Sequence, residues 1–434
     1  MTSPPSRFAA LFVSCLLPAL SLAACSREGS AAVGDLDAAP APGARVAPVE
    51  GDWPQFRGPN QDGISTETGF LKDWPTAGPP VQWRAEVGAG YSGISVAAGL
   101  VFTMFNRDGS EWLSAFDSTD GKVRWKLKMD SEYKDRFGDG PRSTPTVDGS
   151  VVYALGAKGK LVAAKAEKGD QVLWTKDLVR ELGGRIPQWG VSTTPVVEGE
   201  LLLVDVGGPA GRSVVAFDKF TGAVVWTSGD DAAGYSTPIA FTTQGVRQVA
   251  FFTATKISGI SPADGKILWS LPWKTSYDVN AAAPIFIPPN RLFVSSGYDT
   301  GSALLEIRRV EDGFQVSEVW KARNLKNKFS SSIRVGDAIY GFDNETFKAI
   351  ELETGKDLWR KRGLGHGSLT YADGHLVVLG EKGTLVLVEA SPEAYKERAS
   401  VGFFDGKCWT VPTLVGNRLF LRDEEQLVSL DLSS

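Results

Sequence analysis

Few residues in this sequence have the type and spacing that catalysis requires. The chain of 434 residues contains two histidines, His366 and His375, and three cysteines. Two histidines without an H-E-x-x-H or C-x-x-C pattern do not make a zinc site of the common kinds. No G-x-S-x-G sequence stands between a strand and a helix, so a serine hydrolase is not indicated. We therefore expect the protein to have no metal site and no catalytic residues. The sequence disfavours an enzyme.

A second set of residues has the chemistry of binding. Four long polar segments, residues 128–142, 179–190, 271–281 and 321–330, combine bases with aromatic side chains. Such a set suits an anionic ligand or a segment of a partner protein. We expect the bases of residues 323–328 to lie in a solvated loop, and Cys408 to be a small buried residue. The candidate ligand or partner site consists of Arg142, Gln188, Trp189, Tyr277, Asn280 and His366.

These segments form one site only if the fold brings them to one face. A repeat in the sequence predicts such a fold. The phrase F-D-K-F-T-G-A-V-V-W ends at Trp226, and similar phrases with an acid, a turn glycine and a Trp recur. Glycine supplies the positive φ of a hairpin turn, and the Trp strand then packs on the next unit. Four short strands per repeat make one propeller blade. The repeated tryptophans lie 39 to 52 residues apart: Trp83, Trp125, Trp174, Trp226, Trp269, Trp320 and Trp359.

Eight units can be counted from segments of small polar residues, often with Pro, that precede apolar strands between Ile94 and Pro412. The last unit stops where its Trp strand should begin, and the strand at about 81–87 has no unit before it. We predict an all-β, eight-bladed β-propeller of four-stranded antiparallel blades, whose ring this N-terminal strand closes by completing the last blade. The seventh unit lacks both the turn glycine and the Trp, so its strand register stays open.

The N-terminus indicates export. An apolar run at 8–22 follows Arg7 and ends in L-A-A-C, which resembles a bacterial lipobox with cleavage before Cys25 and acylation of its thiol. An ordinary signal-peptidase site at the same alanines is the alternative. Lipidation of Cys25 leaves Cys408 as the one thiol of the mature chain, so no disulfide within the chain is expected.

Composition divides the chain into four parts. We predict a lipoprotein signal peptide at 1–24, a flexible Ala/Pro/Gly tether at 25–50, an N-terminal extension at 51–80 that packs on the propeller, and the propeller at 81–434. The formal net charge of -5 disfavours nucleic acid as a partner. Ser26, in place of Asp, favours the outer membrane over the inner one.

The repeated A-x-D-x-x-T-G-x-x-x-W pattern resembles the tryptophan-docking motif of propellers of the pyrroloquinoline-quinone (PQQ) type, over residues 81–434. Two branches of these propellers matter. Quinoprotein alcohol dehydrogenases bind PQQ and Ca²⁺, whereas BamB-like lipoproteins use the ring as a scaffold in outer-membrane protein assembly. The sequence has no adjacent Cys pair against a quinone and no C-x-x-C-H haem site.

The resemblance implies a non-catalytic scaffold, held by a lipid anchor at the periplasmic face of a bacterial membrane. Its partners would be periplasmic or membrane proteins, and no cofactor is expected. Two alternatives stay open. One is a PQQ-dependent oxidoreductase of alcohols or sugars, with Ca²⁺ and with Trp189 stacked on the quinone; otherwise Trp189 closes the top of its blade. The other is a sensor or carbohydrate-binding propeller with Trp273 and Tyr277 facing solvent.

Overall fold

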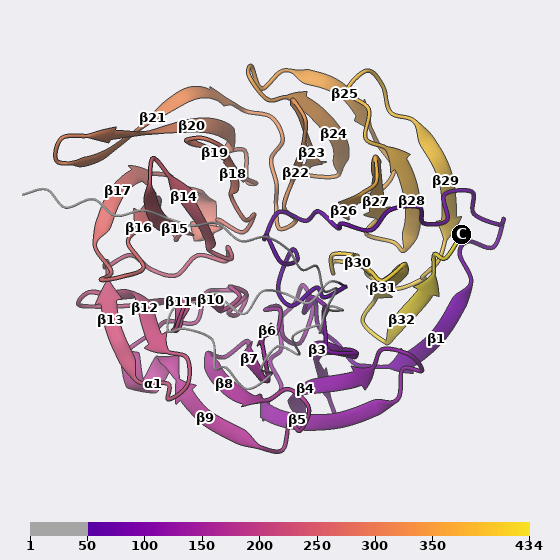
Figure 1. The fold of residues 1–434 in the computed structure, drawn as a ribbon, viewed down its shortest axis with the longest axis horizontal. Helices are drawn as coiled ribbons and strands as arrows, with labels where there is room; N and C mark the ends of the chain where they lie inside the picture. The colour runs from indigo at the N-terminus through magenta and orange to yellow at the C-terminus, as the bar shows by residue number, and fades with distance from the viewer. Residues whose placement is uncertain (1–50) are drawn as a thin grey trace, which may run out of the picture. The chain divides into compact units, whose positions relative to one another are not determined.

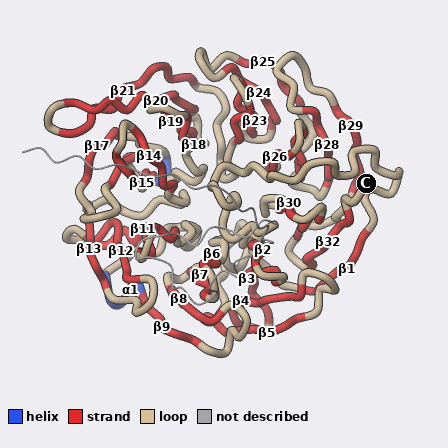
Figure 2. Tube along the Cα trace, in the orientation of Figure 1, coloured by secondary structure: helices blue, strands red, loops and turns tan. Residues whose placement is uncertain are grey.

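The computed structural model describes residues 51–434, and strands arranged around a central axis make up about half of them (Figure 1). In this part of the chain helix is limited to α1 (Leu178–Leu182) and a 3-10 turn, η1 (Ser276–Asp278) (Figure 2). None of the helices in the described range is long and apolar enough to cross a membrane. The predicted signal peptide, the lipidation of Cys25 and the tether lie outside the described residues.

The strands form eight separate sheets of four antiparallel strands, one sheet per blade, as predicted. From the innermost strand outward, blade 1 holds β2 (Ser95–Ala97), β3 (Leu100–Arg107), β4 (Ser110–Asp117) and β5 (Val123–Ser131). Blade 2 holds β6 (Thr146–Asp148), β7 (Val151–Leu155), β8 (Lys160–Lys165) and β9 (Val172–Asp177). Blade 3 holds β10 (Val196–Glu198), β11 (Leu201–Gly208), β12 (Arg212–Asp218) and β13 (Val224–Ser228). Blade 4 holds β14 (Ile239–Thr243), β15 (Val246–Phe252), β16 (Lys256–Ile260) and β17 (Ile267–Pro272).

The second half of the ring repeats this order. Blade 5 holds β18 (Ile285–Ile287), β19 (Arg291–Ser296), β20 (Gly301–Val310) and β21 (Gly313–Ala322). Blade 6 holds β22 (Ile333–Val335), β23 (Ala338–Asp343), β24 (Thr346–Glu351) and β25 (Asp357–Lys361). Blade 7 holds β26 (Ser368–Ala372), β27 (His375–Leu379), β28 (Thr384–Glu389) and β29 (Glu397–Gly402). Blade 8 holds β30 (Thr413–Val415), β31 (Arg418–Arg422), β32 (Gln426–Asp431) and, outermost, β1 (Val81–Glu86).

The N-terminal strand closes the ring, as the sequence predicted. Strand β1 pairs antiparallel with the C-terminal strand β32, with Trp83 opposite Ser429 and Glu86 opposite Gln426. Pairing the two ends of the chain within one blade removes the open edges that the first and last units would otherwise present.

Six of the seven repeated tryptophans join neighbouring blades. Each lies on an outermost strand and donates its indole N–H to a backbone carbonyl in the outer turn of the next blade. Its ring covers a glycine in most of these turns: a Cβ on Gly222, where φ is +70°, would lie 2.7 Å from the Trp174 ring. The donor–acceptor pairs are Trp83 with Ser118, Trp125 with Ala166, Trp174 with Lys219, Trp226 with Pro262, Trp320 with Leu352 and Trp359 with Ser391, at 2.8 to 3.1 Å.

Trp269 departs from this pattern. Its indole N–H donates to Oε1 of Gln248 at 2.7 Å, within its own blade. The reason is the length of the next hairpin, since β20 and β21 keep pairing out to Val310 and Gly313. The tight turn on which Trp269 would dock is therefore displaced. Trp269 is nevertheless buried in a hydrophobic cluster that residues of blades 4 and 5 share, so its ring still stabilises this junction.

Blade 7 has no docking tryptophan, and the structure settles its register. Ala399 pairs with Leu387, at the position where Trp174 pairs with Ala163 in blade 2. The N-terminal extension fills this junction, because Phe70 and Trp74 pack in one cluster with Ala399 and its neighbours from blades 7 and 8.

The first part of that extension crosses one end of the central channel, as the indigo segment of Figure 1 shows. Its backbone and side chains contact the inner strands of blades on different sides of the ring. Arg57 is buried and donates through its guanidinium to three backbone carbonyls. The contacts pair Trp53 with Val96 of blade 1, Gln61 with Pro238 of blade 4, Arg57 with Ser332 of blade 6 and Ile64 with Tyr371 of blade 7.

Candidate functional site

At the other end of the channel, the connections between blades surround a cavity of about 220 Å³, which we call the mouth. Phe56 of the crossing segment is one of its lining residues and forms its floor. The crossing segment therefore lies between the cavity and the other end of the channel.

One position in each blade supplies the upper wall of the mouth. It lies three residues before the residue that precedes the inner strand, for instance before Pro145 or Pro238. In blade 7, where β26 begins earlier, it lies three residues before Leu369. Because every blade enters its inner strand in the same way, these side chains converge on the axis. Seven of the eight line the cavity, and His366 instead lies against Phe329 at 5.3 Å between ring centroids. The eight residues are Tyr91, Arg142, Ser192, Tyr235, Ala281, Phe329, His366 and Trp409.

Below them the wall is made of small residues, among them Thr144, Thr194 and Thr237. These hydroxyls join the blades, since the amide of Thr144 donates to Oγ1 of Thr194 at 3.2 Å and the amide of Thr194 to Oγ1 of Thr237 at 3.3 Å. The mouth therefore narrows from aromatic rings to hydroxyl groups and ends on the Phe56 ring.

Trp189 is the centre of one aromatic group. Its ring centroid lies 5.9 to 6.2 Å from those of Phe137, Tyr235, Tyr277 and Tyr298, and its plane is within 13° of that of Tyr298. Tyr277 and Tyr298 both have positive φ, +63° and +54°, which is uncommon for residues with a side chain. Both rings also pack against Trp189 and against each other, so contacts within the chain form this aromatic group.

Trp409 is the centre of a second group. Its ring lies 4.7 Å from Tyr91 and 4.6 Å from Phe329, and Nζ of Lys407 is 4.5 Å above it. Its indole N–H donates to Oε1 of Glu381 at 2.9 Å, which fixes the ring orientation.

Some charged groups of the mouth have hydrogen-bond partners within the protein, and one has none. Arg142 donates to the carbonyls of Gly138 and Gly140, and burial lowers the pKa of its guanidinium. The Asp135 carboxylate accepts the amide N–H of Phe137 at 2.8 Å. Lys328 lines the cavity and is partly exposed, and its Nζ has no hydrogen bond or ion pair within residues 51–434.

The predicted site residues divide into three groups. Arg142 and Trp189 line the cavity, and Tyr277 lies at its rim against Trp189 with 65% of its surface exposed. Gln188 and His366 lie nearby: the carbonyl of Gln188 accepts the Tyr133 hydroxyl, and burial together with the charge of Lys328 lowers the pKa of His366.

Asn280 and Trp273 require correction. Asn280 does not reach the cavity, because it is fully buried and its amide donates to the carbonyls of Thr253, Ala254 and Trp273. Trp273 does not face solvent, since it is 2% exposed and donates to Ser296. Both side chains brace the connection that carries Tyr277.

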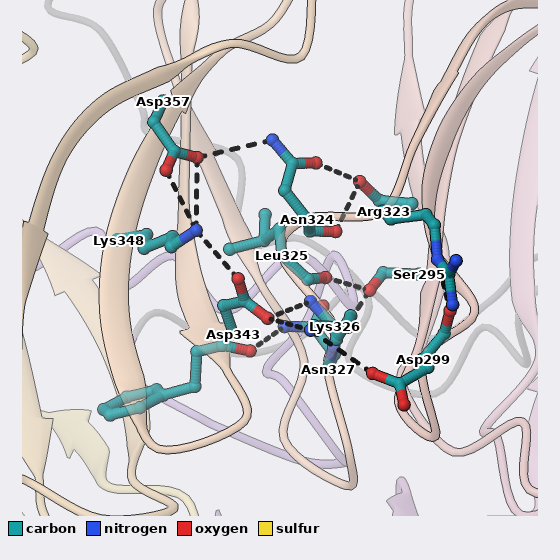
Figure 3. A network of polar contacts seen from close by, with 12 residues as sticks. Ser295, Asp299, Arg323, Asn324, Leu325, Lys326, Asn327, Asp343, Lys348 and Asp357 are labelled. Atoms are coloured by element: carbon teal, nitrogen blue, oxygen red, sulfur yellow. Dashed lines mark hydrogen bonds and ion pairs between the residues drawn. The ribbon is translucent and has the colours of Figure 1, made fainter.

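The segment 323–328 is a solvated loop only in part, because Arg323 is exposed whereas other residues of the segment are buried (Figure 3). Leu325 and Asn327 are buried, and the segment joins blades 5 and 6 through a network of ion pairs and hydrogen bonds. Nζ of Lys348 lies 2.8 Å from Asp343 and 2.9 Å from Asp357 in this network (Figure 3). Positive charge in the sequence alone could not reveal that the acids of the next blade approach it.

Sequence reasoning missed most of the aromatic lining: Tyr91, Phe137, Tyr235, Tyr298, Phe329 and Trp409. A signal was present for four of them, because Tyr91, Tyr235, Phe329 and Trp409 each stand directly before a Ser or Thr that leads into the inner strand. Within 51–434 no group of three or more His, Cys, Asp or Glu side chains is arranged to hold a metal ion.

Solved structures with this fold have low sequence identity to the chain. BamB from Moraxella catarrhalis is 17% identical with a TM-score of 0.55, over 80% of this chain and 97% of that one. The designed protein Ika8 is 12% identical with a TM-score of 0.56, over 81% of this chain and 99% of that one. Quinohemoprotein alcohol dehydrogenase ADHIIG from Pseudomonas putida HK5 is 10% identical with a TM-score of 0.53, over 88% and 80%. These similarities show the fold alone.

Sequence comparison identifies the family. Outer membrane protein assembly factor BamB of Pseudomonas aeruginosa is 50% identical over 42 residues, which is 10% of this chain and 11% of that protein. The match thus spans about a tenth of the curated relative. The family model described as outer membrane protein assembly factor BamB matches residues 109–361 and 343–433, which is most of the chain. The chain belongs to this BamB family of PQQ-like β-propellers.

Proposed function

We propose that this chain is a non-catalytic scaffold that binds partner proteins during outer-membrane protein assembly, at the periplasmic face of the outer membrane and held there by a lipid on Cys25. The observation that carries the proposal is the mouth, which presents Trp, Tyr and Arg side chains in a preformed concavity. These are the residue types that dominate the binding energy of protein interfaces. Membership in the BamB family supports the process, and the export signal supports the compartment.

Deletion of the gene in its own bacterium tests the process. We expect lower levels of folded outer-membrane β-barrel proteins, measured by their heat-modifiable migration in gels, and recovery when the chain is supplied from a plasmid. Unchanged levels would contradict the role in assembly.

Photo-crosslinking in the same cells tests the surface. A photoreactive residue replacing Tyr277, at the rim of the mouth, should crosslink to an assembly protein. Phe220 is a matched control, because it is 58% exposed and lies in the outer turn between β12 and β13. Equal yields at the two positions would show that the mouth is not the docking surface.

The alternative of a PQQ-dependent oxidoreductase has less support from the side chains present. A quinone with three carboxylates needs several free basic groups, whereas the Arg142 guanidinium already donates to two backbone carbonyls and Lys328 is the other base of the cavity lining. A Ca²⁺ site needs several oxygen ligands, and the single carboxylate in the cavity lining, on Asp135, accepts a backbone N–H. Calorimetric titration of the chain with PQQ and Ca²⁺ tests this alternative, and one-to-one binding that Trp189→Ala abolishes would establish it.

A further inference from the structure

Most charged side chains at the mouth have hydrogen-bond partners within the protein, but one does not. This difference indicates the kind of ligand that the mouth binds. The carboxylates around the cavity accept hydrogen bonds from the protein itself, as Glu381 does from Trp409 and Glu424 from the hydroxyl of Tyr91. The cations Arg142 and Lys407 donate to backbone carbonyls. Lys328 lines the cavity, and its ammonium has no such partner in the described part of the chain. A ligand with a carboxylate at this point completes the site.

The shape of the cavity limits how a polypeptide can use it. The floor at Phe56 prevents a chain from threading the ring, and a volume of about 220 Å³ holds side chains but not a folded element. The rim beside Trp189 is apolar and open, since Phe137 is 45% exposed and Tyr277 65% exposed. An extended segment can therefore lie across the rim and send a side chain downward.

We infer that the mouth binds an internal, extended segment of a partner protein, with one aromatic side chain of the segment in the cavity and a neighbouring Asp or Glu on Lys328. The aromatic side chain packs against Trp189 and Tyr298, and its backbone stays above the hydroxyl layer. Aromatic packing provides affinity, and the carboxylate on Lys328 provides selectivity for acidic sequences. This inference rests on the proposed function, because it names the segment by which a partner is bound.

The test is a double-mutant cycle with a defined peptide. The probe is a fluorescein-labelled nonapeptide of Gly and Ser, blocked at both ends, with a central Phe-Glu pair, and its Kd for the purified chain is measured by anisotropy. Replacing Phe by Ala should weaken binding about tenfold or more. Replacing Glu by Gln should weaken binding about tenfold to the unaltered chain and less than about twofold to Lys328→Gln. Lys128→Gln is the matched control, because Lys128 is exposed on β5, and it should behave as the unaltered chain.

Three results would overturn the inference. The first is an equal loss from Glu→Gln with the unaltered chain and with Lys328→Gln. The second is tighter binding of a peptide with a free terminal carboxylate in which Glu is dispensable, which would make the ligand a chain terminus. The third is no saturable binding up to roughly 1 mM. If position 277 crosslinks to an assembly protein but the loss from Glu→Gln does not depend on Lys328, this inference is wrong and the proposed function stands.

Discussion

The propeller carries two circles of aromatic residues, one at its periphery and one at its mouth, and they differ in how their polar atoms are used. At the periphery, indole N–H groups such as that of Trp174 donate to the backbone of the next blade, and the rings lie on glycine. At the mouth, the rings contact one another, and Trp409 donates to a carboxylate side chain. The first arrangement depends on backbone geometry and uses Trp wherever the ring docks, whereas blade 7 has Ala399 at this position. The second depends on side chains, so the same position can be Tyr, Arg, His or Trp and can acquire a binding role.

The largest expected effect is on the free energy of unfolding, and it should differ between the aromatic residues of the periphery and those of the mouth. Trp174→Ala removes a ring packed between blades 2 and 3 and should lower the free energy of unfolding by about 3–5 kcal/mol, because it leaves a cavity and removes a hydrogen bond between the blades. Trp189→Ala, at the open mouth, should lower it by about 1 kcal/mol. Denaturant unfolding of both variants measures the difference. Equal losses would mean that the mouth aromatics are structural as well.

A glycine under a docked ring should show a smaller effect. Gly222→Ala places a Cβ 2.7 Å from the Trp174 ring at a φ of +70°, and should cost about 2–3 kcal/mol. Gly245→Ala shares the positive φ, +79°, but has no atom within 4 Å of the new Cβ, so it should cost about 1 kcal/mol. The difference between the two melting temperatures isolates the ring contact. If the two variants have the same melting temperature, backbone conformation alone explains the recurring spacing of Gly and Trp along this chain.

A buried carboxyl close to the mouth should make the stability of the whole fold depend on pH. Asp205 is buried on β11 and accepts the amide N–H of Gly234, next to Tyr235 of the mouth, and burial raises the pKa of its carboxyl to about 8. An unfolded chain releases this proton near pH 4. The folded state therefore binds the proton more tightly, so the stabilisation is complete below about pH 4 and is lost as the pH rises toward 8.

The measurement is the free energy of unfolding between pH 5 and pH 8. It should fall by up to about 1.4 kcal/mol per pH unit because of Asp205, and Asp205→Asn should flatten this fall. A variant with the same slope as the unaltered chain would show that Asp205 is ionised when folded.

The smallest expected effect is at the rim. Tyr277→Ala removes an exposed ring and should change the free energy of unfolding by less than about 0.5 kcal/mol. It should nevertheless reduce partner crosslinking from a second rim position such as Phe137. If Tyr277→Ala lowers the stability but leaves crosslinking unchanged, Tyr277 has a structural role and does not contact the partner.

The sequence predicted the periphery far better than the mouth. The Trp and Gly spacing was sufficient for the blade count, and the strand around Trp83 was sufficient for ring closure, because both follow from backbone geometry repeated along the chain. Trp269 failed to dock because the deciding feature, the long β20–β21 hairpin, belongs to the following blade. Asn280 and Trp273 turned inward for a similar reason: whether a loop residue points to the axis or into its own blade depends on contacts between segments far apart in sequence.

The crossing segment at the floor also determines the order in which this molecule can be completed. Residues 53–64 contact blades 1, 4, 6 and 7, and β1 pairs only with the last strand of the chain. Synthesis runs from the N-terminus, so these residues are made before most of their partners. The N-terminal part of the chain must wait in an unpaired state, so the time between its synthesis and that of β32 is the period in which this protein most needs protection from aggregation.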